Sequence, residues 1–550
     1  MIVELNFKKM KKNKHKIIAL LLTIGVLSTS CESYLEEENN TALSVENIDG
    51  AIYGQMVNTI YERARETSTY YTSDLYYALE DLGTDIITRS SPITGTDELN
   101  DYVKLNSQNW AIGVYWDNQY RIIASANTVI NAAEADISGL DDADKNTGVA
   151  EAKFFRAMSY FQLVENYGGV PLVLNQITTA QTEFTRASEE QVYAQIINDL
   201  NEALPVLDQN PAKYGKVSKD AVRHLLSKVL LTRGYKSFAG ATDFADAAAL
   251  AETVIANHDL VGAFENLVSI DNQRNSEVIF SYLFGNNSVS RGWGNSRHMK
   301  YQFRFYDYPG LFKSVQGLGT MPTPFYYSLF EDDDERAEAT FARVLYANED
   351  DTVTKGDVTM NIMVGDTAMY FPKTAWSQAA IDAVPYAVIN PGTYFTNDGV
   401  TNTHFPKFKK FDDPSVPFTQ PDQPSQGERD MVMMRSGEAY LIAAEAYLGD
   451  SDPVTAAARL TTLRSRAGLI TPVLPTEVDL DFILDERARE LTGEVNRWMD
   501  LKRTGKLIER TLEHNPHAKL NNALNAKNLL RPIPQREIDN SQGTITQNPL

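Results

Sequence analysis

Residues 150–174 read AEAKFFRAMSYFQLVENYGGVPLVL and set the pattern for the rest of the chain. Apolar side chains recur in this stretch at intervals of three and four, as on one face of an amphipathic helix. They are Phe154, Ala157, Met158, Phe161 and Val164. Gly168 and Gly169 permit the left-handed backbone that ends a helix, and Pro171 prevents the helix from resuming. Because such a helix must bury its apolar face, we expect it to pack against similar helices.

Helical patterning of this kind recurs through the first half of the chain. Trp116, Tyr120, Ile123 and Asn127 share one helical face, and residues 244–257 form an alanine-rich segment. The strongest apolar stripe consists of Val222, Leu225, Leu226, Val229 and Leu230. Helices of about a dozen residues joined by short polar turns are typical of a tetratricopeptide-like array of helix pairs. We therefore predict a mainly α fold.

The pattern changes between residues 264 and 428, where Gly, Pro, Asn and aromatic residues interrupt every apolar run. We expect an irregular, loop-rich part with short strands at 277–283 and 366–371, and helices only near 323–330 and 374–381. Helical patterning returns at Met431, and Leu484 to Trp498 line a last long helix. The predicted parts are 1–30 (signal peptide), 31–47 (acidic tether), 48–263 (N-terminal helical part), 264–428 (loop-rich part) and 429–550 (C-terminal helical part).

The first thirty residues are typical of a secretory signal. Six lysines between Lys8 and Lys16 precede the apolar run Ile17–Leu27, and three small residues follow. An apolar run of this length is too short to span a bilayer as a helix, which needs about 20 residues. Cys31, the only cysteine, comes next and cannot form an internal disulfide. Its position resembles a bacterial lipoprotein box, with Ser28 where Leu is usual, so we predict that acyl chains such as palmitate attach Cys31 to a membrane.

Composition and motifs argue against several function classes. Hydrophobic residues make up 43% and charged residues 23% of the chain, as in a globular protein, and the formal net charge is -22. Such an acidic chain is a poor partner for nucleic acid, whose phosphates require clustered Lys and Arg. The sequence contains neither a Gly-rich phosphate loop nor a Gly-x-Ser-x-Gly nucleophile motif. We expect no enzymatic activity and no cofactor.

Three charged or histidine-containing stretches could be mistaken for catalytic or metal sites. Glu486, Arg487, Glu490, Glu494, Arg497 and Asp500 alternate in charge at helical spacing, which predicts structural ion pairs that keep the carboxylates ionised. His514 and His517 are separated by Asn515-Pro516, which breaks a helix, and a third ligand is missing. The acidic run 331–335 lacks the spacing of a calcium loop, so we interpret it as a solvated helix start. We predict no metal site.

Aromatic residues in irregular stretches are the best candidates for ligand binding. Trp293 stands between Gly292 and Gly294, which leave its ring free to project. A flat ring can pack on the C–H face of a sugar while neighbouring polar groups bond its hydroxyls. For any single ring, packing in the core is the alternative. The candidate ligand-binding residues are Trp110, Trp293, Tyr301, Tyr306, Tyr308 and Trp376.

Motifs along nearly the whole chain resemble the SusD/RagB family of nutrient-binding surface lipoproteins. The most specific are DERARELTGE at 485–494 and RWMDLKR at 497–503, together with the Pro-Ile-Pro at 532–534 and the Gln-Asn-Pro at 547–549. The resemblance implies a SusD-like body with tetratricopeptide-like helix pairs and an irregular ligand-binding part. It also implies a lipid anchor in the outer membrane, facing the cell exterior, and a SusC-like TonB-dependent transporter as partner.

The resulting hypothesis is a cell-surface lipoprotein that binds oligosaccharides without cleaving them and delivers them to such a transporter. One alternative is capture of peptides, because RagB-like members of the family serve peptide import. Another is a surface glycoside hydrolase, which would need two carboxyl groups about 5 to 9.5 Å apart across a cleft.

Overall fold

The computed structural model describes residues 48–67, 78–90, 96–285, 292, 294–299, 308–311, 320–395, 404–413 and 427–548. The chain divides into two compact units, residues 1–49 and residues 50–550. Trp293, Tyr301, Tyr306 and the predicted lipidation site Cys31 lie outside the described residues. All elements named below belong to the second unit.

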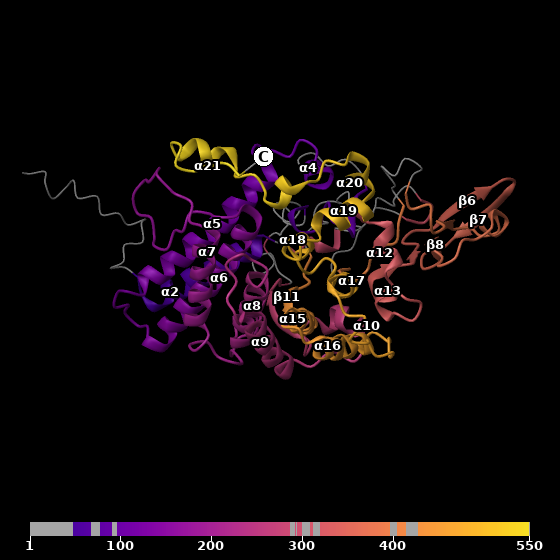
Figure 1. Ribbon diagram of the computed structural model, residues 1–550. Helices are drawn as coiled ribbons and strands as arrows, with labels where there is room; N and C mark the ends of the chain where they lie inside the picture. The colour runs from indigo at the N-terminus through magenta and orange to yellow at the C-terminus, as the bar shows by residue number, and fades with distance from the viewer. Residues whose placement is uncertain are drawn as a thin grey trace, which may run out of the picture. The chain divides into compact units, whose positions relative to one another are not determined.

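Long helices form a continuous array in which each member packs on the next (Figure 1). In packing order they are α5 (Trp110–Ala132), α6 (Asp142–Tyr167), α7 (Glu189–Ala203), α8 (Lys219–Arg233), α9 (Asp243–Asn257), α15 (Ser436–Gly449) and α16 (Pro453–Arg466). Helix α2 (Gly50–Glu66) packs on α5 and α6. Because α9 packs directly on α15, the array continues in space across the residues that separate these helices in sequence. The predicted mainly α fold of packed helices is confirmed.

Helix α6 shows why these segments fold as the sequence predicts. The Asp141 side chain caps its start by accepting from the Asp144 N–H at 2.8 Å, and Gly168 ends it at a φ of +73°. The apolar face is buried as expected, with only Met158 half-buried. Burying Phe154 and Phe161 between neighbouring helices contributes about 1.5–3 kcal/mol for each side chain.

The remaining helices are short and lie mainly in the loop-rich and C-terminal parts. The α-helices are α4 (Asp97–Asp101), α10 (Phe264–Val268), α12 (Pro324–Ser328), α13 (Glu335–Thr340), α14 (Gln378–Asp382), α17 (Leu480–Leu491), α18 (Arg497–Arg503), α19 (Leu507–His514), α20 (Pro516–Asn521) and α21 (Gln535–Asn540). The 3-10 helices are η2 (Ile270–Asn272), η3 (Arg297–Met299) and η4 (Ala526–Leu529). The helices expected near 323–330 and 374–381 correspond to α12 and α14.

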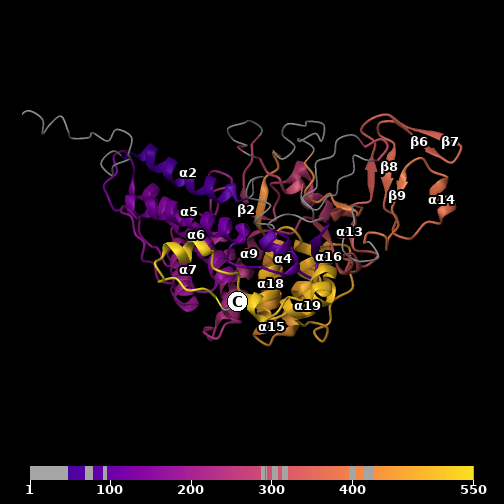
Figure 2. The same ribbon diagram turned by 90° about the horizontal axis from the view of Figure 1, so that it is seen from above.

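The strands are short and pair mostly in twos. The antiparallel pairs are β1 (Ile87–Arg89) with β3 (Thr320–Pro322), β2 (Val278–Tyr282) with β11 (Met431–Arg435), β4 (Phe341–Ala342) with β10 (Lys407–Phe408), and the hairpin β6 (Asp351–Lys355) with β7 (Val358–Ile362). Strands β5 (Val344–Tyr346), β8 (Thr367–Tyr370) and β9 (Ala387–Val388) form a three-stranded sheet. The strands expected at 277–283 and 366–371 correspond to β2 and β8. Figures 1 and 2 both show the hairpin projecting at the opposite end of this unit from α2.

Two predicted helices differ in the structure. Residues from Met431 first form strand β11, because they pair with β2, and α15 begins only at Ser436. The expected last long helix is two helices, because Gly493 adopts a φ of +77° between α17 and α18. In both places a tertiary contact or a single glycine outweighs the helical periodicity. The division of the chain at residues 263 and 428 stays a prediction.

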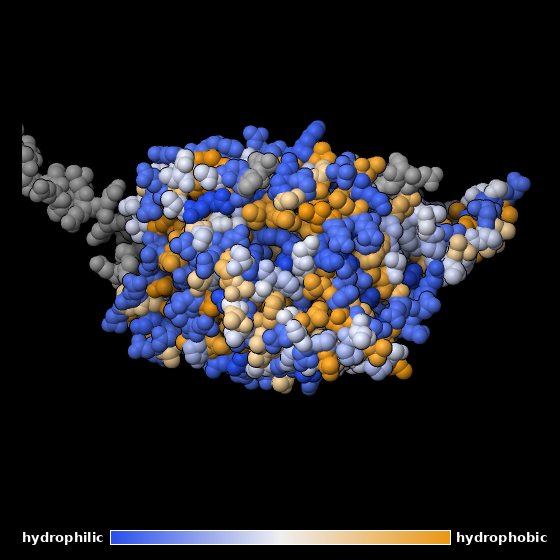
Figure 3. All heavy atoms as spheres, in the orientation of Figure 1, coloured by the Kyte–Doolittle hydropathy of each residue, from blue (hydrophilic) through white to orange (hydrophobic). Residues whose placement is uncertain are grey.

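The surface of the described residues is mixed in polarity, as Figure 3 shows for one face. Apolar residues exposed on and near the projecting hairpin include Tyr346, Val358 and Val364. In the part of the chain that the structure describes, each helix is either too short or too polar to cross a membrane.

Candidate functional site

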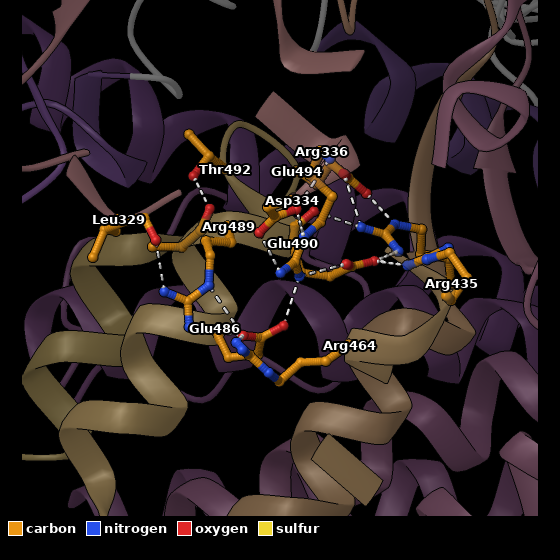
Figure 4. Close-up of polar contacts among 12 residues, drawn as sticks. Leu329, Asp334, Arg336, Arg435, Arg464, Glu486, Arg489, Glu490, Thr492 and Glu494 are labelled. Carbon is orange, nitrogen blue, oxygen red and sulfur yellow. Dashed lines mark hydrogen bonds and ion pairs between the residues drawn. The ribbon is translucent and has the colours of Figure 1, made fainter. Parts of the chain in front are cut away.

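A buried network of charges is centred on α17 (Figure 4). Glu486 is fully buried and accepts from Arg336 at 2.6 Å and from Arg464 at 3.0 Å. Burial alone would raise the pKa of Glu486, but Arg336 and the other guanidinium groups around it lower it to about 2. This carboxylate is therefore held ionised and cannot act as a general acid near neutral pH.

Glu490 and Glu494 extend the network toward strand β11. Glu490 accepts from Arg435 at 2.6 Å and also pairs with Arg466 and Arg336. Glu494 accepts from Arg435 at 2.5 Å and pairs with Lys410. Burial again works against ionisation, and Arg435 and Lys410 lower the pKa of Glu494 to about 2. The prediction that these carboxylates are structural and ionised agrees with this geometry.

The partners, however, differ from those expected for a helix surface. Glu486 forms ion pairs with Arg336, Arg464 and Arg489, and of these three pairs only that with Arg489 has the predicted spacing of three. Most of the other cations come from α13, α16 and β11, and their charged groups are buried with the carboxylates. Spacing on one helix could not reveal these partners. The network therefore joins α17 to the loop-rich part and does not consist of ion pairs on the surface of one solvated helix.

Beside this network, hydrogen bonds join two loop stretches. The backbone N–H of Asn295 donates to the Gly427 carbonyl at 2.9 Å, and the Gly427 N–H donates back at 3.0 Å. The Asp413 carboxylate accepts from the Arg429 N–H at 2.8 Å, and the Asn295 side chain donates to the Arg429 carbonyl at 2.9 Å. We call Asn295, Asp413, Gly427 and Arg429 the loop base. In sequence, Asn295 comes shortly after Trp293, and Asp413 and Gly427 flank residues 414–426.

A small cavity of about 50 Å³ adjoins the loop base. Arg297 lies over the Phe411 ring at 5.4 Å, and both side chains line the cavity together with Asn295 and Arg429. Aromatic, guanidinium and amide groups side by side are the types that bind a sugar through its C–H face and its hydroxyls.

The glycines on both sides of Trp293 have the backbone freedom that the sequence suggested. Gly292 has a φ of +57° and Gly294 a φ of +70°. A residue with a Cβ is strained in this left-handed region, so both positions favour glycine.

The three candidate aromatics that the structure describes lie on different elements. Tyr308 is half-buried and its ring meets His404 edge-on at 5.3 Å. Trp376 is half-buried and packs against Tyr370 of β8 at 5.4 Å. Trp110 was expected in an irregular stretch, but it is the first residue of α5, with 48% of its surface exposed. The Asn109 side chain caps that helix, which the periodicity around Trp110 did not reveal.

These three rings do not form one cluster. Figures 1 and 2 both show α5 and β8 at opposite ends of the unit, so Trp110 and Trp376 belong to separate surfaces. The loop-base residues were not singled out from the sequence. The contact between Asn295 and Arg429 joins positions more than a hundred residues apart, which spacing in the sequence does not reveal.

The two histidines considered as metal ligands have other contacts. The His514 ring stacks on Phe325 at 3.7 Å, and Nδ1 of His517 lies 2.7 Å from the Thr88 hydroxyl. Within the described ranges, no group of three or more His, Cys, Asp or Glu side chains is arranged to hold a metal ion.

The chain matches two protein-family profiles and several known proteins. A family profile described as "SusD family" matches residues 276–550, and one described as "Starch-binding associating with outer membrane" matches residues 33–231. SusD-like protein P2 of Formosa agariphila is 26% identical, covering 98% of this chain and all of that protein. The starch-binding protein SusD of Bacteroides thetaiotaomicron is 25% identical over 67% of this chain and 66% of its own length.

Solved structures share the fold. A laminarin-binding SusD-like protein superposes with a TM-score of 0.69 at 24% identity, covering 91% of this chain and 99% of that one. Surface glycan-binding protein A of Bacteroides thetaiotaomicron, solved with laminarihexaose, gives 0.68 at 18% identity, with 91% and 99% covered. The prediction of a SusD-like, mainly helical fold with short strands in a loop-rich region is confirmed.

Proposed function

Because the chain belongs to the SusD family, we propose that it captures oligosaccharides at the cell surface and delivers them to a SusC-like TonB-dependent transporter in the outer membrane. Proteins of this family bind glycans and are not catalysts, so the prediction that the chain is not an enzyme is confirmed. Association with the outer membrane is likewise a property of the family.

One observation carries the position of the proposed binding site. Asn295 and Gly427 exchange two backbone hydrogen bonds and Asp413 accepts from the Arg429 N–H, so described residues that adjoin Trp293 and residues 414–426 in sequence lie together. Binding side chains on loops held by a rigid scaffold lose less conformational entropy when a ligand orders them. The site of this proposal therefore lies at the loop base, with Trp293, Tyr301 and Tyr306 as proposed aromatic contacts. Tyr308 meets His404 and packs against the buried cluster that includes Met369 and Phe371, so it is not assigned to this site.

The attachment to the membrane belongs to the same proposal. Acyl chains on Cys31 would hold the protein at the outer membrane, and the acidic residues that follow it would form an extended tether. Replacing Cys31 with Ser should release the protein from the membrane fraction. Retention of the Cys31→Ser protein in that fraction would contradict lipid anchoring.

Binding is tested with the mature body and a panel of maltohexaose, laminarihexaose, xylohexaose, mannohexaose and oligogalacturonate, measured by titration calorimetry. Trp293→Ala should weaken the tightest interaction about tenfold or more, because ring stacking on a sugar contributes about 0.5–1.5 kcal/mol beyond the buried area. The melting temperature should stay nearly unchanged. Tyr346→Ala, which removes an exposed aromatic ring on β5, is the matched control and should bind normally.

Two other results would change the assignment. Binding of a pool of short peptides, with every panel sugar inactive, would favour the peptide-capture alternative. Release of reducing ends from any panel sugar by the isolated protein would show catalysis and contradict the proposal. A large fall in the melting temperature of Trp293→Ala would identify that ring as part of the core.

A further inference from the structure

We propose that a groove on helix α5 is a second carbohydrate-binding site, separate from the loop base. The groove has a volume of about 480 Å³, within the range of about 300–1,000 Å³ usual for small-ligand sites. It is lined by α5, by residues of the 171–184 segment and by the C-terminal segment. The inference rests on the proposed function only for the class of ligand, since the position comes from the groove itself.

The floor and walls of the groove are aromatic and aliphatic. The rings of Trp116 and Tyr120 lie 5.1 Å apart on α5, with Trp116 almost fully buried and Tyr120 half-buried. The Tyr120 hydroxyl donates to the Pro171 carbonyl at 2.9 Å, which fixes the ring between the helix and the segment that follows α6. Phe184 and Ile545 complete the apolar lining. Tyr120 and Phe184, which are half-buried, can offer ring surface to the C–H face of a pyranose, while Trp116 and Ile545 are buried behind them.

The rim of the groove carries polar side chains with spare bonding capacity. Arg121, Asn175 and Gln176 line it and are exposed. Among the described residues, none of these three side chains forms a hydrogen bond or an ion pair. A guanidinium group and two carboxamides together supply donors and acceptors, as vicinal hydroxyls require. An aliphatic or lipid ligand could not form hydrogen bonds with those groups, so the lining favours a polyhydroxylated ligand.

The groove is held open by contacts of the C-terminal segment with the N-terminal helices. Arg536 pairs with Asp117 of α5, and the Thr544 hydroxyl donates to the Phe184 carbonyl at 2.6 Å. Figures 1 and 2 show the yellow C-terminal segment lying beside these helices. The groove therefore exists without a ligand, and binding would cost little reorganisation.

Filling the groove tests the inference. Ala124 lines it and is exposed on α5, so Ala124→Trp should occupy the space without removing a buried contact. Ala194 of α7 is also exposed but lies elsewhere, and Ala194→Trp is the matched control. Calorimetry uses the full mature chain and the tightest-binding member of the oligosaccharide panel. The wild type and Ala194→Trp should bind two equivalents, and Ala124→Trp should bind one.

A second variant reports on the rim without filling the space. Gln176→Ala should weaken the groove interaction about fivefold, the effect of losing one neutral hydrogen bond. Trp293→Ala should weaken the other equivalent about tenfold and leave binding in the groove unchanged.

The outcomes separate the two proposals. A single equivalent that Trp293→Ala weakens and Ala124→Trp leaves unchanged would overturn the second site and leave the proposed function standing. A single equivalent lost only in Ala124→Trp would support the groove and contradict the loop-base site. Failure of the wild type to bind any panel sugar would overturn both.

Discussion

At the scale of single residues, Glu490 is a carboxylate that stays ionised inside the protein. It is fully buried, yet three guanidinium groups from three different elements reach it. Burial alone would raise the pKa of this carboxyl, but Arg466, Arg435 and Arg336 hold it well below its usual range. Removing Glu490 takes one buried carboxylate away from three buried guanidinium groups and leaves excess positive charge there, which is far more costly than losing a surface pair.

We therefore expect Glu490→Ala to lower the free energy of unfolding by about 3–5 kcal/mol. Urea denaturation followed by circular dichroism measures the change. Glu513→Ala, which removes an exposed carboxylate of α19, is the control and should cost less than about 0.5 kcal/mol. Similar losses in both variants would mean that the network contributes little.

Stability should also fall in acid, with a known sign. The pKa of Glu486 is 4.5 in the unfolded chain and about 2 in the fold, so its contribution is complete above pH 4.5 and is lost as pH falls toward 2. Burial lowers the pKa of His224 from 6.5 to about 4, so a first loss begins below pH 6.5. The urea midpoint should fall from pH 6 to pH 3, and Glu486→Gln should make the fall below pH 4.5 shallower. An unchanged midpoint over this range would contradict the assignment.

At the scale of elements, one glycine divides what the periodicity suggested was a single helix. Gly493 has a φ of +77° between α17 and α18, and the turn brings Glu494 to Arg435 while Arg497 pairs with Asp85. A straight helix through this point would carry Arg497 in a different direction. The break between α17 and α18 therefore allows both of these buried ion pairs to form.

Gly493→Ala should lower the free energy of unfolding by about 1–2 kcal/mol, the usual cost of a left-handed residue with a Cβ. Gly113 provides the matched control, because it lies inside helix α5 with open space where a Cβ would point. Gly113→Ala should instead stabilise the protein by about 0.5–1 kcal/mol. Thermal melts of the two variants should shift in opposite directions, and a stabilising Gly493→Ala would contradict the role of this turn.

At the scale of the whole second unit, the C-terminal segment is joined to the N-terminal helices of the array. The Asn548 side chain is buried and donates to the carbonyls of Tyr167 and Arg531, each at 2.9 Å. It also accepts from Arg186 at 2.7 Å. These bonds connect the C-terminal segment to α6 and to the segment before α7, which lie hundreds of residues earlier in sequence.

Asn548→Ala should lower the free energy of unfolding by about 1–3 kcal/mol, because it removes two hydrogen bonds donated to carbonyl groups and one accepted from Arg186. Asn540→Ala, an exposed change at the end of α21, is the control and should be nearly neutral. Hydrogen exchange should also rise in residues 165–187 of Asn548→Ala alone. Unchanged exchange there would show that the C-terminal segment does not stabilise these helices.

The sequence by itself determined the helices of the array and the strands β2 and β8. Their patterns are local, since an apolar face repeats every three or four residues along a helix and a glycine or proline ends it. Motifs in residues 485–503 and the terminal Gln-Asn-Pro were enough to identify the family. The structural role of Glu486 and Glu490 also followed from their arginine neighbours in sequence.

Only the tertiary structure decided which residues meet. The partners of Glu490, the loop base and the α5 groove all join positions far apart in the chain, and spacing within one element carries no information about such contacts. The strand β11 forms because β2 lies beside it, which overrides the helical pattern after Met431. Long-range pairing, not local propensity, thus fixed where a ligand can be held.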